Sequence, residues 1–333
     1  MKYLNQPITI NHLTLNNRLV MPPMATAKST PEGKFSEALG EYYKDRAKGG
    51  YIGLIITEHS YISQQGKASN GQLSIACDSD IEGLAKLVKA AQTDGTKVMA
   101  QINHAGSAAS ADITGLEPAA PSSVKHPRSA NADSAPPQEL SEAEIAQIVQ
   151  QFANAALRAK KAGFDGVEIH GSHGYLLNQF YSPLTNHRTD RYSAASVENR
   201  VRIHLEVIAA VRKAVGDDYP VALRFGGCDY TAGGSTIEDS KKACLLFEQA
   251  GIDLLDISGG MYGYMVSDCK EPGYFQDMSS AIKQAVSVPV ILTGGIQTAQ
   301  EAELLLERSA ADLIGVGRAM LKNARWAEEN LTF

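Results

Sequence analysis

The feature that most constrains the fold is an alternation of short apolar runs with longer segments of helical spacing. The runs are rich in Val, Ile and Leu and are hydrophobic almost throughout. Continuous rather than alternating hydrophobicity indicates strands that are buried on both faces, as in parallel sheets. There are eight such runs, at 18–24, 53–58, 97–102, 166–171, 220–225, 254–259, 289–294 and 313–317.

The segments between the runs carry apolar residues at helical spacing, and several begin after a Ser, Thr or Asp that can cap a helix. They cover 36–47, 81–94, 142–162, 197–215, 236–250 and 299–307. Eight strand–helix repeats predict an α/β fold, a closed (β/α)8 TIM barrel. A doubly wound open sheet is the alternative, but the turn after the first run, ATAKSTPEGK, lacks the GxGxxG of a dinucleotide site.

Two further segments complete the predicted architecture. ITINHLTL (8–15) is typical of an N-terminal hairpin with its turn at Asn11-His12, and it could close the bottom of the barrel. Residues 106–139, after the third strand, are rich in Ala, Ser and Pro and predict a long irregular loop over the mouth. We interpret this loop as a lid or substrate wall, with a mobile insertion as the alternative. Because composition shifts nowhere else, we expect a single domain over 1–333.

Charge and cysteine content exclude several classes of protein. The net charge is −6, the sequence pI is about 5.8 and no stretch is rich in Lys and Arg, so we expect no nucleic-acid partner. No run of 18 apolar residues occurs and the N-terminus lacks a signal-peptide core, so we expect no membrane span and no export. Reduced thiols in a cytoplasmic protein are expected from four widely spaced cysteines, Cys77, Cys228, Cys244 and Cys269.

The stretch GVEIHGSHGYLLNQF places His170 at the end of the fourth predicted strand, with His173 and Tyr175 in the following turn. Three interpretations are open. The histidines could bind a metal ion with Glu168 as a third ligand, or they could merely end the strand. We favour the third, in which two imidazoles donate hydrogen bonds to an anionic or carbonyl oxygen and Tyr175 is a nearby proton source.

The ends of the seventh and eighth strands predict a phosphate site. TGGI (293–296) supplies Gly294 and Gly295, and GVGR (315–318) supplies Gly317 and Arg318. Glycines allow the backbone to approach a phosphate, while the arginine adds charge and paired donors. Tight packing is the alternative reason for the glycines.

Gln101 and Arg224 interrupt apolar runs near the ends of the third and fifth strands. A polar group inside a barrel needs a partner, and Gln101 could find one among other core polar atoms. Arg224 requires an acidic side chain or an electron-rich ligand, because an unpaired buried guanidinium is costly. Together with the phosphate site, these residues predict a phosphorylated ligand with a planar polar head beneath the histidines.

On its motifs the chain resembles the Old Yellow Enzyme family over nearly its whole length. The segments that carry the resemblance are NNRLVMPPM (16–24), AQINHAG (100–106), GFDGVEIHGSHGYLLNQFYSP (163–183), NHRTDRYSAASVENRVR (186–202), ALRF (222–225), TGG (293–295) and IGVGRAML (314–321). The resemblance implies an FMN-dependent oxidoreductase on a (β/α)8 barrel, with NADH or NADPH as co-substrate. It also implies ping-pong reduction of an activated alkene, an α,β-unsaturated carbonyl or nitro compound.

The resemblance also implies roles for individual residues. His170 and His173 would hold the oxygen of the small-molecule acceptor, and Tyr175 would donate a proton. Gln101 and Arg224 would contact the edge of the flavin ring. The phosphate would be held by Gly294, Gly295, Gly317 and Arg318, and the ring would be lined by Pro22, Pro23, Met24, Ala25 and His59. No metal site is implied, and the oligomeric state stays open, a homo-oligomer included.

One departure from the family pattern is Ala25, which stands where many relatives have Thr or Cys beside the flavin. Since alanine has no side-chain donor, we expect a shifted flavin potential. Two other functions remain as alternatives. One is a metal- or phosphate-dependent barrel lyase or hydrolase that uses His170 and His173, and the other is a non-catalytic flavin-binding barrel.

Overall fold

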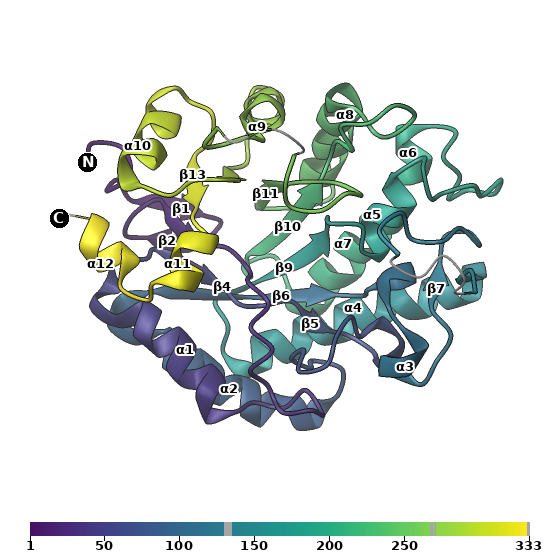
Figure 1. The fold of residues 1–333 in the computed structure, drawn as a ribbon, viewed down its shortest axis with the longest axis horizontal. Helices are drawn as coiled ribbons and strands as arrows, with labels where there is room; N and C mark the ends of the chain where they lie inside the picture. Colours follow the sequence, from purple (N-terminus) through teal and green to yellow (C-terminus); the bar gives the residue numbers. More distant parts are fainter. Residues whose placement is uncertain (130–134, 267–268, 270, 332–333) are drawn as a thin grey trace.

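The computed structural model of the chain describes residues 1–129, 135–266, 269 and 271–331, and it contains a closed barrel of eight parallel strands (Figure 1). The barrel closes because β4 pairs with both β3 and β6, and β13 pairs back to β3. All eight predicted strands are confirmed. They are β3 (Leu19–Met21), β4 (Leu54–Ile56), β6 (Lys97–Asn103), β9 (Gly166–Gly171), β10 (Val221–Gly226), β11 (Leu254–Ser258), β12 (Val290–Thr293) and β13 (Leu313–Gly315).

Helices surround the barrel. The predicted ones are α1 (Glu37–Ala47), α2 (Ile81–Ala91), α4 (Glu142–Ala162), α8 (Ile237–Gln249) and α10 (Ala299–Glu307). The predicted helix 197–215 is broken at Val201 into α6 (Val197–Arg200) and α7 (Arg202–Val215). Helices that the apolar spacing did not predict are α3 (Ala111–Thr114), α5 (Leu176–Tyr181), α9 (Gln276–Lys283), α11 (Arg318–Lys322) and α12 (Trp326–Asn330).

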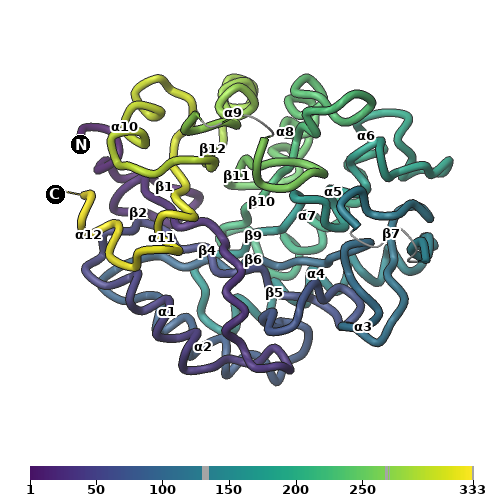
Figure 2. The backbone as a smooth tube through the Cα atoms, in the orientation of Figure 1, coloured from purple at the N-terminus to yellow at the C-terminus, as the bar shows by residue number. Residues whose placement is uncertain are grey.

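Polar caps fix where the predicted helices begin. The side chains of Ser36, Ser141, Thr236 and Thr298 each accept a hydrogen bond from a backbone N–H of the first turn. Figure 2 shows the chain travelling once around the barrel, so that its first residues lie beside α10. There Glu303 accepts hydrogen bonds from the backbone N–H groups of Lys2, Tyr3 and Leu4.

The N-terminal hairpin closes the end of the barrel where the strands begin, which we call the bottom. β1 (Ile8–Ile10) pairs antiparallel with β2 (Leu13–Leu15), and Asn11 at the turn has a positive φ of 54°. The hairpin inserts Ile10, Leu13 and Leu15 into a cluster with strand residues, which we call the bottom core. The strand residues are Val20, Leu54, Ile56, Met99, Ala222, Leu254, Ile291 and Leu313.

The segment 106–139 is more ordered than the sequence predicts. It contains a 3₁₀ turn at Gly106–Ala108, the helix α3 and a short parallel pairing of β7 (Ala119–Ala120) with β8 (Gln138–Glu139). Buried Ala119 and Ala120 explain the difference, because small apolar side chains let the segment pack closely. Residues 130–134 of this predicted loop lie outside the described residues.

Within the part of the chain that the structure describes, no helix is both long and apolar enough to span a lipid bilayer. The four cysteines are free thiols. Cys228 and Cys244 are buried, whereas Cys77 is exposed.

Candidate active site

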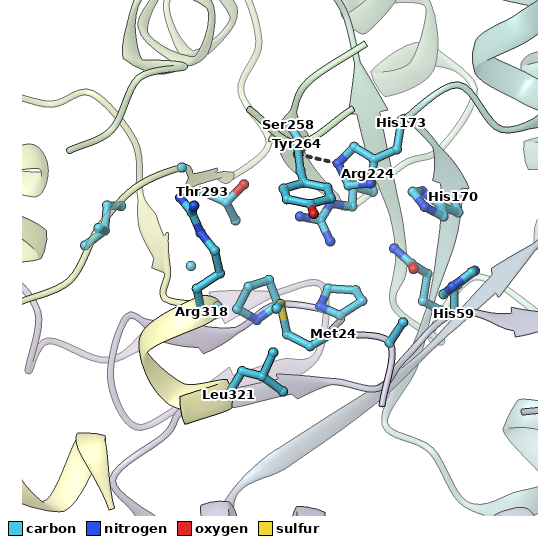
Figure 3. Close-up of a pocket in the computed structure, with 18 of the residues that line it drawn as sticks. Met24, His59, His170, His173, Arg224, Ser258, Tyr264, Thr293, Arg318 and Leu321 are labelled. Carbon is cyan, nitrogen blue, oxygen red and sulfur yellow. Dashed lines mark hydrogen bonds between the residues drawn. The ribbon is translucent and has the colours of Figure 1, made fainter. Parts of the chain in front are cut away.

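A cavity of about 510 Å³ opens at the end of the barrel where the strands finish, which we call the mouth (Figure 3). All fourteen residues predicted from the sequence line this one cavity. They are Pro22, Pro23, Met24, Ala25, His59, Gln101, His170, His173, Tyr175, Arg224, Gly294, Gly295, Gly317 and Arg318. Strand ends bring them together, since the carboxyl ends of barrel strands converge on one face.

The turn after β9 presents His173 and Tyr175 to the cavity beside His170. His173 has a φ of 59° and Gly174 a φ of 73°, so two successive residues adopt the left-handed conformation. A non-glycine residue costs energy there and persists when its surroundings fix it. The His173 N–H donates to Gly259 O at 3.1 Å and the Gly174 N–H donates to Asn178 Oδ1 at 2.8 Å.

Three imidazoles and one phenol pack against each other above the cavity. The ring centroids of His170 and His173 are 5.2 Å apart and nearly perpendicular. Tyr175 lies 5.1 Å from the His170 ring and stacks on His59 at 5.3 Å. The His59 Nδ1 atom is 3.1 Å from Gln72 Nε2 and 3.0 Å from Asn103 Nδ2, so two amides orient that ring.

Serine hydroxyls contact one nitrogen of each histidine of the pair. His173 Nε2 lies 2.7 Å from Ser258 Oγ (Figure 3). His170 Nδ1 lies 3.2 Å from Ser172 Oγ. Burial, with neighbouring cationic and imidazole groups, lowers the pKa of both histidines well below its usual value, so both are neutral near pH 7. When each serine donates, the other ring nitrogen carries the proton and is a hydrogen-bond donor.

Tyr175 is placed to carry a proton. Burial raises the pKa of its phenol, and Arg128 offsets part of that shift. The phenol is therefore protonated over the whole neutral range. It makes ring contacts with two histidines, which leaves its orientation fixed by packing.

The loop after β6 is anchored on the histidine turn. Arg128 Nη2 donates to His173 O at 2.6 Å, and His126 Nε2 lies 3.0 Å from Gly174 O. The backbone N–H of Arg128 in turn donates to His126 Nδ1, so the neutral imidazole bridges both elements. These contacts favour the wall interpretation of the described part of this loop over that of a mobile insertion.

Four buried polar residues lie together at the inner end of the cavity, and we call them the polar floor: Gln101, Glu168, Arg224 and Asp256. Gln101 and Arg224 line the cavity, whereas Glu168 and Asp256 contact them without lining it. Gln101 Nε2 donates to Glu168 Oε1 at 2.8 Å, and Arg224 Nε lies 3.2 Å from Asp256 Oδ2. The acidic side chain predicted to face Arg224 is Asp256, and Gln101 contacts a core polar atom, which was the alternative considered for it. In Figure 3 the Arg224 side chain points into the cavity.

The other end of the cavity is lined by Arg318 and by the glycines of the predicted phosphate site, Gly294, Gly295 and Gly317. A Cβ on Gly294 or Gly295 would lie 2.8–2.9 Å from the Tyr274 ring, and one on Gly317 would lie 2.9 Å from Met24 Sδ. Side chains are therefore excluded from the cavity wall at these positions. Among the residues that the structure describes, Arg318 makes only long contacts there, 3.3 Å from Nη2 to Tyr274 Oη and 3.7 Å from Nη1 to Met265 Sδ.

The segment Pro22–Ala25 follows β3 and forms one side of the cavity. Its continuation is held by Thr26, whose hydroxyl donates to Glu58 Oε2. Glu58 is buried, and burial raises its pKa to about 7. His59 follows Glu58 directly. The chain after β4 therefore holds the Pro22–Ala25 segment in place through Glu58 and contributes the His59 ring to the cavity.

Several lining residues were not predicted from the sequence: Ser258, Tyr264, Tyr274, Thr293, Ile296, Gly315, Leu321 and Lys322. Ser258 and Thr293 end strands, which is the signal that could have identified them. Lys322 lies four residues after Arg318 and so shares its helix face. Tyr264 and Tyr274 belong to the segment after β11, whose richness in Gly and Tyr marks a mouth loop but gives no position for a side chain.

The geometry does not favour a metal ion at the histidine pair. Glu168, the third ligand considered from the sequence, bonds to Gln101 instead. Among the residues that the structure describes, no three His, Cys, Asp or Glu side chains are grouped so that they could hold a metal ion.

Comparison with known proteins gives consistent results. Residues 3–330 match the NADH:flavin oxidoreductase / NADH oxidase family. The chain is 40% identical to an NADH oxidase from Thermoanaerobacter brockii, covering 96% of this chain and 49% of that protein. It is 38% identical to an NADPH dehydrogenase from Clostridium acetobutylicum, covering 95% of this chain and 90% of that protein.

A solved structure agrees with these relatives. The Old Yellow Enzyme homologue from Zymomonas mobilis superposes with a TM-score of 0.84 at 28% identity, covering 99% of this chain and 94% of the other. The chain spans about half the length of the Thermoanaerobacter NADH oxidase and most of the other two proteins. The chain belongs to the NADH:flavin oxidoreductase / NADH oxidase family.

Proposed function

We propose that residues 1–333 form a single FMN-binding barrel that takes hydride from NADH or NADPH and reduces activated alkenes. The acceptor class is an α,β-unsaturated carbonyl or nitro compound. The observation that carries the proposal is the convergence of two neutral imidazoles and a protonated phenol on one side of a cavity whose inner end holds Arg224.

The cavity residues fit FMN. Its volume of about 510 Å³ lies in the range of cofactor sites. Gly294, Gly295 and Gly317 leave room for a phosphate, and the long contacts of Arg318 leave its donors available. The ring would lie against Pro22–Ala25, with the polar floor at its edge.

The floor matches the edge of a flavin ring. Arg224 lines the cavity while its Nε atom faces Asp256, so its guanidinium is placed to donate to ring acceptor atoms. Gln101 donates through Nε2 to Glu168, which leaves its carbonyl oxygen for an N–H of the ring. Ala25 adds no side-chain donor, and this supports a flavin potential different from that of relatives with Thr or Cys there.

When bound, the flavin supplies the redox chemistry, because it accepts a hydride from the nicotinamide and delivers one to the acceptor. The residues of this chain orient and polarise. His170 and His173 donate hydrogen bonds to the carbonyl or nitro oxygen of the acceptor, and these bonds strengthen as negative charge develops there. The serine partners hold the two rings, so little reorganisation accompanies the charge.

Tyr175 completes the reaction by protonating the acceptor carbon that lies next to the polarised group. Its raised pKa keeps the proton on the phenol until the carbon becomes basic. The His59 ring stacked on Tyr175 fixes the direction in which the hydroxyl points.

The test is a visible spectrum combined with anaerobic half-reactions. We expect purified protein to bind FMN, to be bleached by NADH or NADPH, and to regain colour when cyclohexenone is added. In Tyr175→Phe, bleaching by the nicotinamide should persist while recolouring by cyclohexenone slows. A folded protein without affinity for FMN would contradict the proposal, and an unchanged rate in Tyr175→Phe would favour the non-catalytic flavin-binding alternative.

A further inference from the structure

We propose that Glu168 carries a proton at neutral pH and that Asp256 alone is the counter-ion of Arg224, so that this acid pair sets the positive charge presented to the ligand. The inference rests on the proposed function, since the ligand is taken to be FMN. It assigns Glu168 and Asp256 as positioning residues, neither of which lines the cavity.

The polar floor places two carboxyl groups around one guanidinium. Glu168 and Asp256 are each 0% exposed and Arg224 is 5% exposed. They project from three neighbouring strands, β9, β11 and β10, and Arg224 is in register with Asp256 on one side. With both acids ionised, the floor would carry a net negative charge in a buried site, which is costly unless compensated.

The two acids differ in their partners. Asp256 Oδ2 lies 3.2 Å from Arg224 Nε, so its negative charge faces a cation. Glu168 receives a hydrogen bond from a neutral amide, Gln101 Nε2, and it forms no ion pair with a described residue. Among the described residues, Glu168 Oε2 and both carboxylate oxygens of Asp256 lack a hydrogen-bond partner, so the neighbouring cation is what distinguishes the two acids. A buried carboxylate keeps its charge when a cation lies beside it, whereas a buried carboxyl without one is more stable as the neutral acid.

The charged and titratable groups that face Glu168 come from the elements around it. They are Arg224 on β10 and Asp256 on β11, with the neutral amide of Gln101 on β6. Burial and the Asp256 charge raise the pKa of Glu168 well above its usual value, although Arg224 and Gln101 oppose the shift. Burial also raises the pKa of Asp256, but Arg224 opposes that shift directly, so Asp256 is the acid that ionises first.

This arrangement has a consequence for bound FMN. Reduction adds negative charge to the ring, and Arg224 attracts that charge. Asp256 neutralises part of the attraction, so it lowers the affinity for the reduced cofactor relative to the oxidised one. Protonated Glu168 adds no charge, but it holds the Gln101 amide so that the carbonyl oxygen of Gln101 is left for the ring.

The experiment compares two isosteric variants, Glu168→Gln and Asp256→Asn, by the midpoint potential of bound FMN at pH 7. Glutamine mimics a protonated glutamate, so Glu168→Gln should leave the potential unchanged. Asp256→Asn should favour the reduced cofactor at least tenfold over the oxidised one, which raises the potential of a two-electron couple by about 30 mV. Asp256→Glu, which keeps the charge, should restore the wild-type potential.

Equal shifts in Glu168→Gln and Asp256→Asn would overturn the inference, because Glu168 would then be ionised. No shift in either variant would also overturn it, since the pair would not influence the cofactor. A second readout does not need bound FMN. Infrared spectra of the wild-type protein should contain a protonated-carboxyl band that is lost in Glu168→Gln. Absence of that band from the wild-type protein would contradict the inference. Failure of wild-type protein to bind FMN would instead contradict the proposed function.

Discussion

The two ends of the barrel interior differ in what they bury, apolar side chains at the bottom and polar or charged groups at the mouth. The bottom core consists of apolar side chains that are 9% exposed or less, and the hairpin residues Ile10, Leu13 and Leu15 fill it. The mouth buries imidazoles, carboxyls and a guanidinium, and among the described residues it leaves Glu168 Oε2 and both carboxylate oxygens of Asp256 without hydrogen-bond partners. Apolar burial stabilises a fold, whereas unpaired buried polar atoms destabilise it. The bottom core therefore stabilises the fold, whereas the mouth holds functional groups at a cost in stability.

The largest effect on stability is expected at the bottom. Leu15→Ala removes a fully buried side chain from the bottom core, and we expect the free energy of unfolding to fall by about 2–5 kcal/mol. Denaturant unfolding measures this. FMN affinity and turnover should be unchanged at temperatures where the variant is folded. If FMN affinity falls in parallel, the two ends are coupled and the separation is wrong.

The largest effect on catalysis is expected at the mouth. His170→Ala removes one donor to the acceptor oxygen, and loss of such a donor typically costs about 10²–10³-fold in rate. Rapid-mixing measurements should detect this loss in the reduction of cyclohexenone but not in the oxidation of the nicotinamide. The free energy of unfolding should fall by less than in Leu15→Ala, because the imidazole borders an open cavity. A larger loss of stability than in Leu15→Ala would contradict the comparison.

The pH dependence of stability should also separate the regions. Burial lowers the pKa of six histidines, to about 4 for His59 and about 3 for His204, whereas the unfolded chain takes up these protons below about pH 6.5. Each contribution is therefore complete above pH 6.5 and is lost as the pH falls. Three carboxyls have raised pKa values in the folded chain. As the pH falls they bind protons in the folded chain before they do so in the unfolded chain, which stabilises the folded chain. The groups are His59, His104, His126, His170, His173 and His204 against Glu58, Glu168 and Asp256.

With six histidines against three carboxyls, the unfolded chain binds more protons than the folded chain near pH 5. The free energy of unfolding should then fall as the pH is lowered from 6 to 5. His204 has no hydrogen-bond partner on either ring nitrogen, so His204→Leu should reduce this slope by about one proton. Leu15→Ala should shift the curve without changing its slope. An unchanged slope in His204→Leu would show that this imidazole is protonated in the folded chain.

The smallest effect is expected from a residue that acts through another. Ser258→Ala removes the hydrogen bond to His173 Nε2, whose net contribution is about 0.5–1.5 kcal/mol. Cyclohexenone reduction should slow by about two- to tenfold, and Ser172→Ala provides a matched comparison at His170. A loss beyond a hundredfold would mean that Ser258 contacts the acceptor itself.

The repeat architecture could be predicted because it is encoded locally. Each of the eight barrel strands is marked by a continuous apolar run, and cap residues such as Ser141 and Thr298 mark helix starts. Strand ends also explain why distant residues such as Gln101 and Arg318 could be assigned to one cavity. The break at Val201 was not predicted, because apolar spacing continues across it.

The contacts that loops make could not be predicted from local patterns. Tyr274 packs against Gly294 and Gly295, and Arg128 reaches His173 O, but neither segment has a periodicity that fixes where its side chains lie. The partner of Glu168 depends on the register between β6 and β9, which an apolar run does not specify. Long-range geometry therefore had to come from the structure.

The hairpin that seals the bottom has a kinetic consequence for the proposed reaction. Because Ile10, Leu13 and Leu15 close that end, the proposed electron donor and electron acceptor would both enter the site from the mouth. Each substrate in excess should therefore inhibit binding of the other. The turnover rate would then depend on exchange of substrates at the mouth as well as on the chemical steps.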